Sequence, residues 1–364
     1  MKKIVRATAL AGALALAHAA CGEAPEEDNG DAGGTTGGTE TTAAASDFQG
    51  CMVTDSGGVD DRSFNASAWA GLQAAEEELG IDVKYVESNT ETDFTPNVQQ
   101  MVSDDCGIII TVGFLLGDAT AEAAQANPDE RFAIVDFAYE EPIENVKPLI
   151  FDTAQASFLA GYLAAGMTET GTVATFGGIN IPTVSIFMDG FADGVAHYNE
   201  VKGTDVELLG WDKEAQDGSF TGDFQNQANG QNLTNNFIQQ GADIIMPVAG
   251  PVGLGAAAAA QEADGVKIIW VDTDGYESAS QYAPLFLTSV VKEIDNAVLE
   301  ATRQAVDDEF TGEPYVGTLE NEGVSIAPFH DFEDDVPDEL KTELEDLRQQ
   351  IIDGEITVES PSSP

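Results

Sequence analysis

The pattern that governs this chain is first seen in the stretch Val53-Thr-Asp-Ser-Gly-Gly-Val-Asp-Asp-Arg-Ser-Phe-Asn-Ala-Ser-Ala-Trp69. An apolar strand ends here in a glycine turn that carries several carboxylates, and an aromatic residue and an amide then begin a helix. Glycines let backbone amides approach a ligand, and a helix N-terminus presents free N–H groups. The stretch is therefore suited to gripping a flat, polyhydroxylated small molecule.

The same alternation of apolar strands and amphipathic helices continues through the body of the chain. The predicted strands cover residues 52–54, 83–86, 108–112, 132–136, 173–176, 206–209, 244–248, 268–272 and 286–290. Such alternation indicates parallel sheets that are covered by helices on both faces. A second series of strand–helix units begins near residue 172. We therefore expect an α/β fold with two doubly wound parallel-sheet lobes and a ligand cleft between them.

The lobes are expected to share the chain in several pieces. Residues 47–152 form lobe 1, which is completed by about 287–315, and residues 153–286 form lobe 2, which is completed by about 316–358. The chain then crosses between lobes near 151–154, 286–290 and 314–320. Residues 359–364 are a short tail.

The N-terminus reads as an export signal followed by a tether. Residues 1–20 begin with Lys2, Lys3 and Arg6, and the apolar run that follows is too short to span a bilayer. Cys21 lies in a lipobox-like context and is the predicted lipidation site, although His18 leaves cleavage as an ordinary secreted protein open. Residues 21–46 have almost no large apolar side chain, so we expect a disordered linker on a lipid anchor.

The charge balance is strongly acidic. The chain has 14 Lys and Arg against 65 Asp and Glu, a net charge of −51. This charge argues against nucleic acid and anionic lipid surfaces as partners. Acidic residues are spread over the whole chain, which is typical of a solvated surface in an acidic proteome adapted to high salt.

Two further cysteines, Cys51 and Cys106, each open a predicted strand. If the two strands are parallel neighbours, both thiols lie at the same edge of a sheet and can approach disulfide distance. Export makes oxidation possible. We predict a disulfide, with two separate buried thiols as the alternative.

Carboxylates, glycines and aromatic side chains follow most of the predicted strands. The first strand is followed by Asp55, Asp61, Ser63, Phe64 and Asn65; others are followed by Asp118, Asp136, Gly250, Gly253 and Asp272. In parallel sheets ligands bind outside the carboxyl ends of the strands. Basic residues are almost absent there, which favours a neutral or cationic ligand over a phosphate or a carboxylate.

A nucleoside is a ligand that can interact with all three kinds of side chain at these strand ends: the carboxylates, the aromatic ring and the amide. Carboxylate pairs accept hydrogen bonds from vicinal hydroxyls, Phe64 can stack a base, and Asn65 can present a donor and an acceptor to its edge. Lys292 follows a predicted hinge strand and is placed to pair with Asp272 or with a ribose hydroxyl. The segment 272–275 lacks the ligand positions of a calcium loop, so no metal and no cofactor are predicted.

Several motifs in the chain form a recognisable set. They are Asp55-x-Gly-Gly-Val-Asp-Asp-Arg-Ser-Phe-Asn65, Gly113-Phe-x-x-x-Asp118, Phe151-Asp-Thr-Ala-Gln-Ala-Ser-Phe-Leu-Ala-Gly-Tyr162, Gly190-Phe-x-x-Gly194, Gly218-Ser-Phe220, Ala249-Gly-x-x-Gly253, Val271-Asp-x-Asp274, Ser289-Val-Val-Lys292 and Ile351-Ile-Asp-Gly-Glu-Ile356. Together these motifs resemble the basic membrane lipoprotein family of ABC-transporter substrate-binding proteins. The resemblance covers residues 50–358 and implies the class I fold of periplasmic binding proteins.

The resemblance also implies roles for single residues. Phe64 would stack the base, and Asn65 and Asp118 would bond its edge. Asp272 and Lys292 would hold the ribose, helped by backbone amides near Gly250 and Gly253, while Asp55 and Asp61 would line or order the first turn; Ser63 completes the predicted site. The chain departs from the family pattern at Gly218-Ser-Phe220 and at Pro251, which leaves the second stacking aromatic open.

The function expected from these observations is that of an extracytoplasmic, lipid-anchored, monomeric receptor. It would bind a nucleoside, with a purine as the first choice, by closure of its lobes and deliver it to an ABC permease, touching the membrane through its anchor alone. The alternatives are a receptor for another neutral, sugar-like ligand, a sensor lipoprotein, and a nucleoside hydrolase. The hydrolase is disfavoured because only His197 and His330 follow the leader and neither is part of an evident catalytic pairing.

Overall fold

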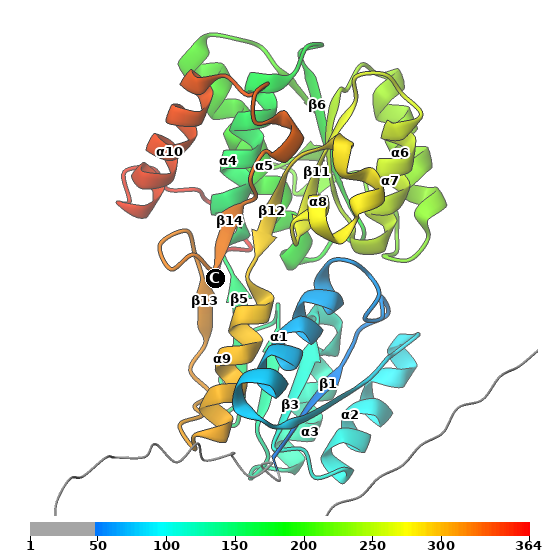
Figure 1. The fold of residues 1–364 in the computed structure, drawn as a ribbon, viewed down its shortest axis with the longest axis vertical. Coiled ribbons are helices and arrows are strands. Elements are labelled where there is room, and N and C mark those ends of the chain that lie inside the picture. The colour runs from blue at the N-terminus through cyan, green and yellow to red at the C-terminus, as the bar shows by residue number, and fades with distance from the viewer. Residues whose placement is uncertain (1–47) are drawn as a thin grey trace, which may run out of the picture. The chain divides into compact units, whose positions relative to one another are not determined.

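Residues 48–364 are described by the structure, a computed structural model, and they form two large sheets that are covered by helices (Figure 1). The first sheet has six strands in the order β13-β5-β4-β3-β1-β2, each parallel to its neighbours. Its strands are β1 (Gln49–Val53), β2 (Asp82–Val86), β3 (Ile108–Val112), β4 (Phe132–Val135), β5 (Val146–Phe151) and β13 (Tyr315–Gly317). The helices on it are α1 (Phe64–Leu79), α2 (Phe94–Ser103), α3 (Gly117–Ala126) and α9 (Ile294–Val306). We call this unit lobe 1.

Alternate residues of β3 show why both faces of this sheet are covered. Ile108 and Ile110 belong to the core that includes residues of α1 and α9, whereas Ile109 belongs to the core with α2 and α3. Successive side chains of a strand point to opposite faces, so an uninterrupted apolar run requires a helical layer on each side.

The second sheet repeats this strand order. Its six strands lie in the order β14-β12-β11-β10-β6-β7, and only β14 is antiparallel to its neighbour. The strands are β6 (Thr172–Gly177), β7 (Glu207–Leu209), β10 (Ile244–Val248), β11 (Lys267–Asp272), β12 (Phe286–Lys292) and β14 (Val324–Ile326). The predicted fold of two doubly wound α/β lobes is confirmed, and we call this second unit lobe 2.

The helices of lobe 2 also form two layers. One layer holds α4 (Thr153–Met167), α5 (Pro182–Lys202) and α10 (Asp338–Ile352), and the other holds α6 (Gln227–Gln239), α7 (Gly253–Gln261) and the short α8 (Gly275–Ser278) (Figure 1). The remaining elements are the pair β8 (Trp211–Asp212) and β9 (Asp217–Gly218), and the 3₁₀ turns η1 (Glu91–Asp93), η2 (Phe114–Leu116), η3 (Gly250–Val252), η4 (Ser280–Leu285) and η5 (His330–Phe332).

Strand β5 is absent from the predicted strands. Pro148 lies in its middle, and a proline inside an apolar run argues against a strand. The strand nevertheless pairs with β4 on one side and with β13 on the other.

The chain passes between the sheets at three places. It leaves lobe 1 between β5 and α4, returns between β12 and α9, and leaves again between β13 and β14. The return lies later than the expected 286–290, because β12 pairs with β11 up to Val291 and so belongs to lobe 2. Residues 287–292, which were expected to complete lobe 1, are therefore part of the second sheet.

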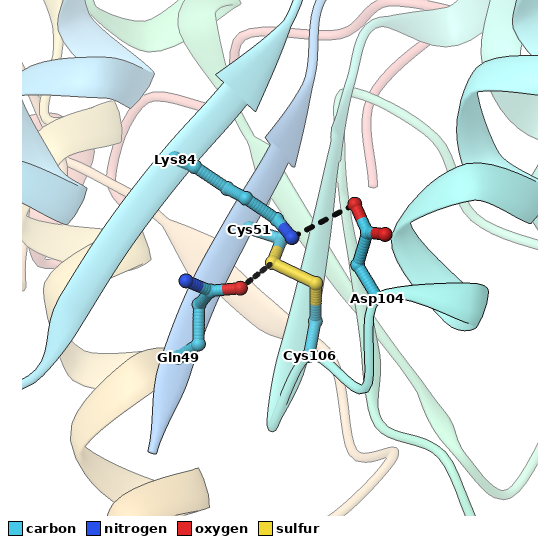
Figure 2. The surroundings of a disulfide bond; sticks show 5 residues. All are labelled: Gln49, Cys51, Lys84, Asp104 and Cys106. Atoms are coloured by element: carbon cyan, nitrogen blue, oxygen red, sulfur yellow. Dashed lines mark hydrogen bonds and ion pairs between the residues drawn. A yellow bond between two sulfur atoms is a disulfide. The ribbon is translucent and has the colours of Figure 1, made fainter. Parts of the chain in front are cut away.

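The predicted disulfide between Cys51 and Cys106 is present (Figure 2). Strands β1 and β3 are parallel neighbours, and the two Cα atoms lie 6.0 Å apart. Lys84 on β2 forms an ion pair with Asp104 beside the bond, at 2.9 Å. The disulfide thus joins β1 to the turn before β3.

The predicted signal peptide, the lipidation site Cys21 and the linker lie outside the described residues. Among residues 48–364, no helix is long and apolar enough to span a bilayer.

Candidate functional site

A pocket lies between the carboxyl ends of the strands of the two lobes. Its cavity volume is about 70 Å³. The residues that line it are Asp55, Gly57, Asp61, Phe64, Asn65, Gly113, Phe114, Leu115, Asp136, Ile181, Thr183, Val184, Phe187, Phe224, Val248, Ala249, Gly250, Pro251, Val271, Asp272 and Lys292.

The turn after β1 is ordered by carboxylates. Asp61 accepts hydrogen bonds from the backbone N–H groups of Ser63, Asn65 and Ala66. The Asn65 side chain donates from Nδ2 to Asp55 at 2.8 Å and to Asp61 at 3.0 Å. These bonds hold the first turn of α1 at the edge of the pocket.

Asn65 also provides an unused acceptor. Its amide nitrogen faces two carboxylates, which fixes the orientation of the side chain, and its Oδ1 is buried with no hydrogen-bond partner. A buried polar atom without a partner is costly, so this oxygen is suited to accept a hydrogen bond from a ligand.

Lys292 lies between two carboxylates at the bottom of the pocket. Its Nζ is 2.5 Å from Asp136 Oδ2 and 3.3 Å from Asp272 Oδ1, and its side chain is 3% exposed. Burial would lower the pKa of Lys292, but the two carboxylates more than offset this effect, and the pKa is raised. The lysine is therefore an ammonium group that is fully engaged within the protein.

The two carboxylates beside Lys292 occupy equivalent places in the two lobes. Asp136 follows β4 and Asp272 ends β11, and these strands hold the same position in their sheets. Both residues adopt a left-handed backbone, with φ of 61° and 69°. Such strained positions cluster at functional sites.

Hydrogen bonds join the lobes at the rim of the pocket. Ser63 Oγ donates to Asp272 Oδ2 at 2.6 Å. Arg62 donates from Nη1 to the carbonyl of Ser278 at 3.1 Å and accepts at its own carbonyl from Thr273 Oγ1 at 3.1 Å. The lobes are therefore in contact, as expected of a closed binding cleft.

Aromatic rings form the apolar walls. Phe64 and Phe114 come from lobe 1, and Phe187 and Phe224 come from lobe 2. The Lys292 ammonium lies 4.7 Å from the centroid of the Phe64 ring, within cation–π distance.

Seven of the ten predicted ligand-binding residues line the pocket: Asp55, Asp61, Phe64, Asn65, Gly250, Asp272 and Lys292. The other three, Ser63, Asp118 and Gly253, do not. Ser63 is buried with its hydroxyl on Asp272, Asp118 is an exposed residue in the first turn of α3, and Gly253 opens α7 against Trp270. A direct role of these three in ligand binding stays a prediction.

Sequence reasoning missed part of the site. Asp136 was noted at the end of its strand but was not assigned to the site, although the strand-then-aspartate pattern that it shares with Asp272 could have revealed it. Phe114 stands in the motif Gly113-Phe-x-x-x-Asp118 but was not assigned to the site, whereas Phe187 and Phe224 carry no such signal because each is one apolar residue among many in a helix or a loop.

Burial also affects the acids of the first turn. It raises the pKa of Asp55, although hydrogen bonds from Asn65 and Gly57 partly offset the effect. It raises the pKa of Asp61 to about 6, against the opposing effect of the hydrogen bonds from Ala66, Asn65 and Ser63. Within the described part of the chain, no group of three or more His, Cys, Asp or Glu side chains is placed to hold a metal ion.

Comparison with known families establishes what kind of site this is. The sequence model of a family described as "ABC transporter substrate-binding protein PnrA-like" (Bmp) matches residues 48–362. The chain belongs to this family. The resemblance seen in the motifs is confirmed, and this Bmp-family protein is a solute-binding protein of an ABC transporter rather than an enzyme.

Relatives of this Bmp-family protein share most of its length. It is 31% identical to "ABC transporter nucleoside-binding protein BmpA" of Lactococcus lactis, with 99% of each chain covered. It is also 31% identical to "CD4+ T-cell-stimulating antigen" of Listeria monocytogenes, over 88% of this chain and 90% of the relative.

A solved structure shows the same two-lobed fold. The solute-binding protein of an ABC transporter system from Aeropyrum pernix matches with a TM-score of 0.78 and 26% identity. The match covers 86% of this chain and 94% of that one.

Proposed function

We propose that this Bmp-family protein binds a nucleoside, with a purine as the first choice, and delivers it to an ABC permease. The observation that carries the proposal is Asn65, which lines the pocket together with Phe64 and has a buried Oδ1 without a hydrogen-bond partner. A planar base with an N–H donor at its edge can stack on the ring and satisfy this oxygen in the same pose.

The charges of the pocket support a neutral ligand. Asp55, Asp61, Asp136 and Asp272 line it, and Lys292, the one cation among the described residues that line it, is already paired with two of them. A phosphate would meet excess negative charge without a free cation, whereas ribose hydroxyls can donate to these carboxylate oxygens.

The aromatic walls support a stacked base. Phe64 in lobe 1 and Phe224 in lobe 2 both line the pocket. Phe220, which belongs to the departing motif, instead packs edge-on against Trp211, with ring centroids 6.0 Å apart. We assign the second stacking position to Phe224.

The proposal includes the place where the protein works. Relatives from Pyrococcus species carry the name "uncharacterized lipoprotein". Together with the predicted leader and Cys21, this supports a receptor that is lipid-anchored on the extracytoplasmic face and meets the membrane through its anchor; the proposal takes the receptor to be a monomer.

Calorimetric titration tests the proposal. Adenosine, inosine, guanosine and uridine are titrated into the purified protein, alongside glucose, galactose and ribose. The proposal requires binding of a nucleoside, and binding of sugars in its place, or of no nucleoside, would overturn it.

Four variants then locate the ligand. Phe64→Ala, Phe224→Ala and Asp272→Ala should each weaken binding by roughly tenfold or more, since each stacking or charged contact contributes about 1–3 kcal/mol. Phe220→Ala is the matched control, because it removes a nearby ring that does not line the pocket. Equal losses for Phe220→Ala and Phe224→Ala would contradict the assignment of the second stacking ring.

A further inference from the structure

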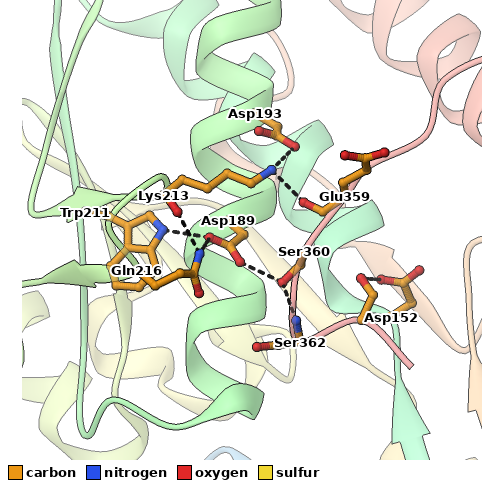
Figure 3. Close-up of polar contacts among 10 residues, drawn as sticks. Asp152, Asp189, Asp193, Trp211, Lys213, Gln216, Glu359, Ser360 and Ser362 are labelled. Carbon is orange, nitrogen blue, oxygen red and sulfur yellow. Dashed lines mark hydrogen bonds and ion pairs between the residues drawn. The ribbon is translucent and has the colours of Figure 1, made fainter.

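The segment of residues 359–364 lies along lobe 2 and reaches the hinge (Figure 3). Ser360 Oγ donates to Asp189 Oδ2 at 2.6 Å, and Lys213 Nζ donates to the Glu359 carbonyl at 2.6 Å. Ser363 Oγ then donates to Asp152 Oδ1 at 3.2 Å, directly after β5, where the chain first crosses between the lobes. The segment is thus tied to lobe 2 and to the hinge.

Asp189 is the main attachment point. This carboxylate on α5 is fully buried, and it accepts hydrogen bonds from Trp211 Nε1 at 2.9 Å, Gln216 Nε2 at 2.8 Å and Ser360 Oγ. Among the described residues it has no ion-pair partner, so these neutral donors replace the water that it loses. Trp211 and Gln216 donate to Oδ1, and Ser360 donates to Oδ2, so the attached segment supplies the hydrogen bond that Oδ2 would otherwise need from water.

The attached segment forms a wall of a second cavity next to the ligand pocket. Residues 361–364 line this cavity together with Ile150, Phe151 and Thr153 of the first crossing. Phe114, Asp136, Thr183 and Lys292 line both spaces. The second cavity therefore lies behind the Asp136–Lys292 pair, between that pair and the segment.

We propose that residues 359–364 are a strap that closes the hinge side of the ligand site, and that Asp189 is the residue that positions it. The strap limits access of solvent to the Asp136–Lys292 pair and to the first and second crossings. The ligand then enters and leaves the pocket mainly when the lobes open at its mouth. The strap blocks release of the ligand through the hinge side. This inference rests on the solute-binding function and not on the identity of the ligand.

Amide hydrogen exchange of the ligand-free protein tests the strap directly. Three variants are compared with the full chain: deletion of residues 359–364, Ser360→Ala and Asp189→Asn. We expect exchange of amides in 150–155 and 286–294 to accelerate by at least about tenfold in the deletion, because the deletion removes the bonds of Ser360 and Ser363 to carboxylates and the loss of one such bond already has an effect of this size. Amides of β3, remote from the strap, should keep their rates, and Ser103→Ala, whose hydroxyl bonds only its own helix, is the matched control.

The dissociation rate of bound nucleoside is the second measurement. Dissociation should accelerate in the deletion and in Ser360→Ala, with a smaller effect in Ser360→Ala. Unchanged hinge exchange in the deletion would overturn the strap. If the full chain binds no nucleoside, the proposed ligand fails, and the exchange experiment alone decides on the strap; if Asp189→Asn does not fold, the deletion and Ser360→Ala still decide.

Discussion

Among the described residues that line the ligand pocket, carboxylates outnumber ammonium groups. Asp136 and Asp272 share Lys292, and Asp55 and Asp61 rely on hydrogen bonds from Asn65 and from backbone N–H groups. Each charge is stabilised by a specific local partner, so single substitutions here should have effects that depend on which partner is lost.

Substitution of Lys292 should be severely destabilising. Lys292→Met leaves two buried carboxylates without their cation, which should lower the free energy of unfolding by about 3–5 kcal/mol. Lys84→Met removes an exposed pair with Asp104 and should lower it by less than about 1 kcal/mol. Urea unfolding of the two variants checks this difference, and equal losses would contradict the burial argument.

Asp61 should make stability depend on pH. The pKa of Asp61 is raised to about 6 in the folded protein. Between about pH 6 and pH 4 the side chain is therefore protonated in the folded state, whereas it is ionised in the unfolded chain. Its contribution to the free energy of unfolding therefore increases as the pH falls through 6. The free energy of unfolding should increase from pH 7 to pH 5 by more in the wild type than in Asp61→Asn. Equal increases in the two proteins would contradict a raised pKa of Asp61.

Close packing of helices and a covalent link hold the elements that carry the pocket. Helices α4 and α5 approach each other through glycines: a Cβ on Gly194 would lie 2.0 Å from the Phe158 carbonyl oxygen, and one on Gly161 would lie 2.1 Å from that of Phe191. These contacts fix the position of α5, which carries both Phe187 of the pocket and Asp189, to which the strap is hydrogen-bonded.

Alanine at Gly194 should separate this helix pair. The added methyl group meets rigid backbone, so we expect a loss of roughly 1–3 kcal/mol in the free energy of unfolding. Gly166→Ala, on α4 itself, places its Cβ against the flexible side chain of Leu340 and should cost less. Thermal or urea unfolding compares the two, and a larger loss at Gly166 would contradict the packing argument.

The disulfide should stabilise lobe 1. It links residues that are 55 positions apart, so the variant that lacks both cysteines, Cys51→Ala with Cys106→Ala, should lose roughly 2–4 kcal/mol of unfolding free energy. Treatment of the wild type with a reductant in urea should give a comparable loss, while the double variant should not respond to it. If the reductant also destabilised the double variant, the loss of unfolding free energy could not be due to the Cys51–Cys106 disulfide.

For the whole molecule, like-charge repulsion is the dominant electrostatic feature. Acidic residues greatly outnumber basic ones, and many of them are exposed along α10 and in the segment before it. Ions screen the repulsion between exposed charges.

The melting temperature should therefore rise with salt. We expect an increase between 0.1 M and 2 M potassium chloride, measured by circular dichroism. Potassium chloride is used because it is a weaker stabiliser of apolar burial than sulfate, which would act by a second route. A melting temperature that stays flat over this range would refute the role of charge repulsion.

Most of the order of strands and helices, and a third of the residues that line the pocket, follow from local patterns in the chain. Apolar runs separated by amphipathic helices predict parallel sheets, and the rule that ligands bind at the carboxyl ends of strands places Asp55, Phe64, Asn65 and Asp272 in one cleft. The disulfide could also be predicted from the sequence, because its formation requires only that β1 and β3 be neighbours in the sheet.

Contacts between distant residues could not be predicted in this way. The bond from Lys292 to Asp136 spans 156 positions, and the bond from Ser360 to Asp189 spans 171. Such pairs form because the hinge and the packing of α5 bring their elements together, and no short-range periodicity encodes that approach. The carboxylates Asp55 and Asp61 of the opening stretch can therefore be assigned to the pocket from the sequence, whereas the pairing of Lys292 and the attachment of residues 359–364 depend on the packing of the two lobes.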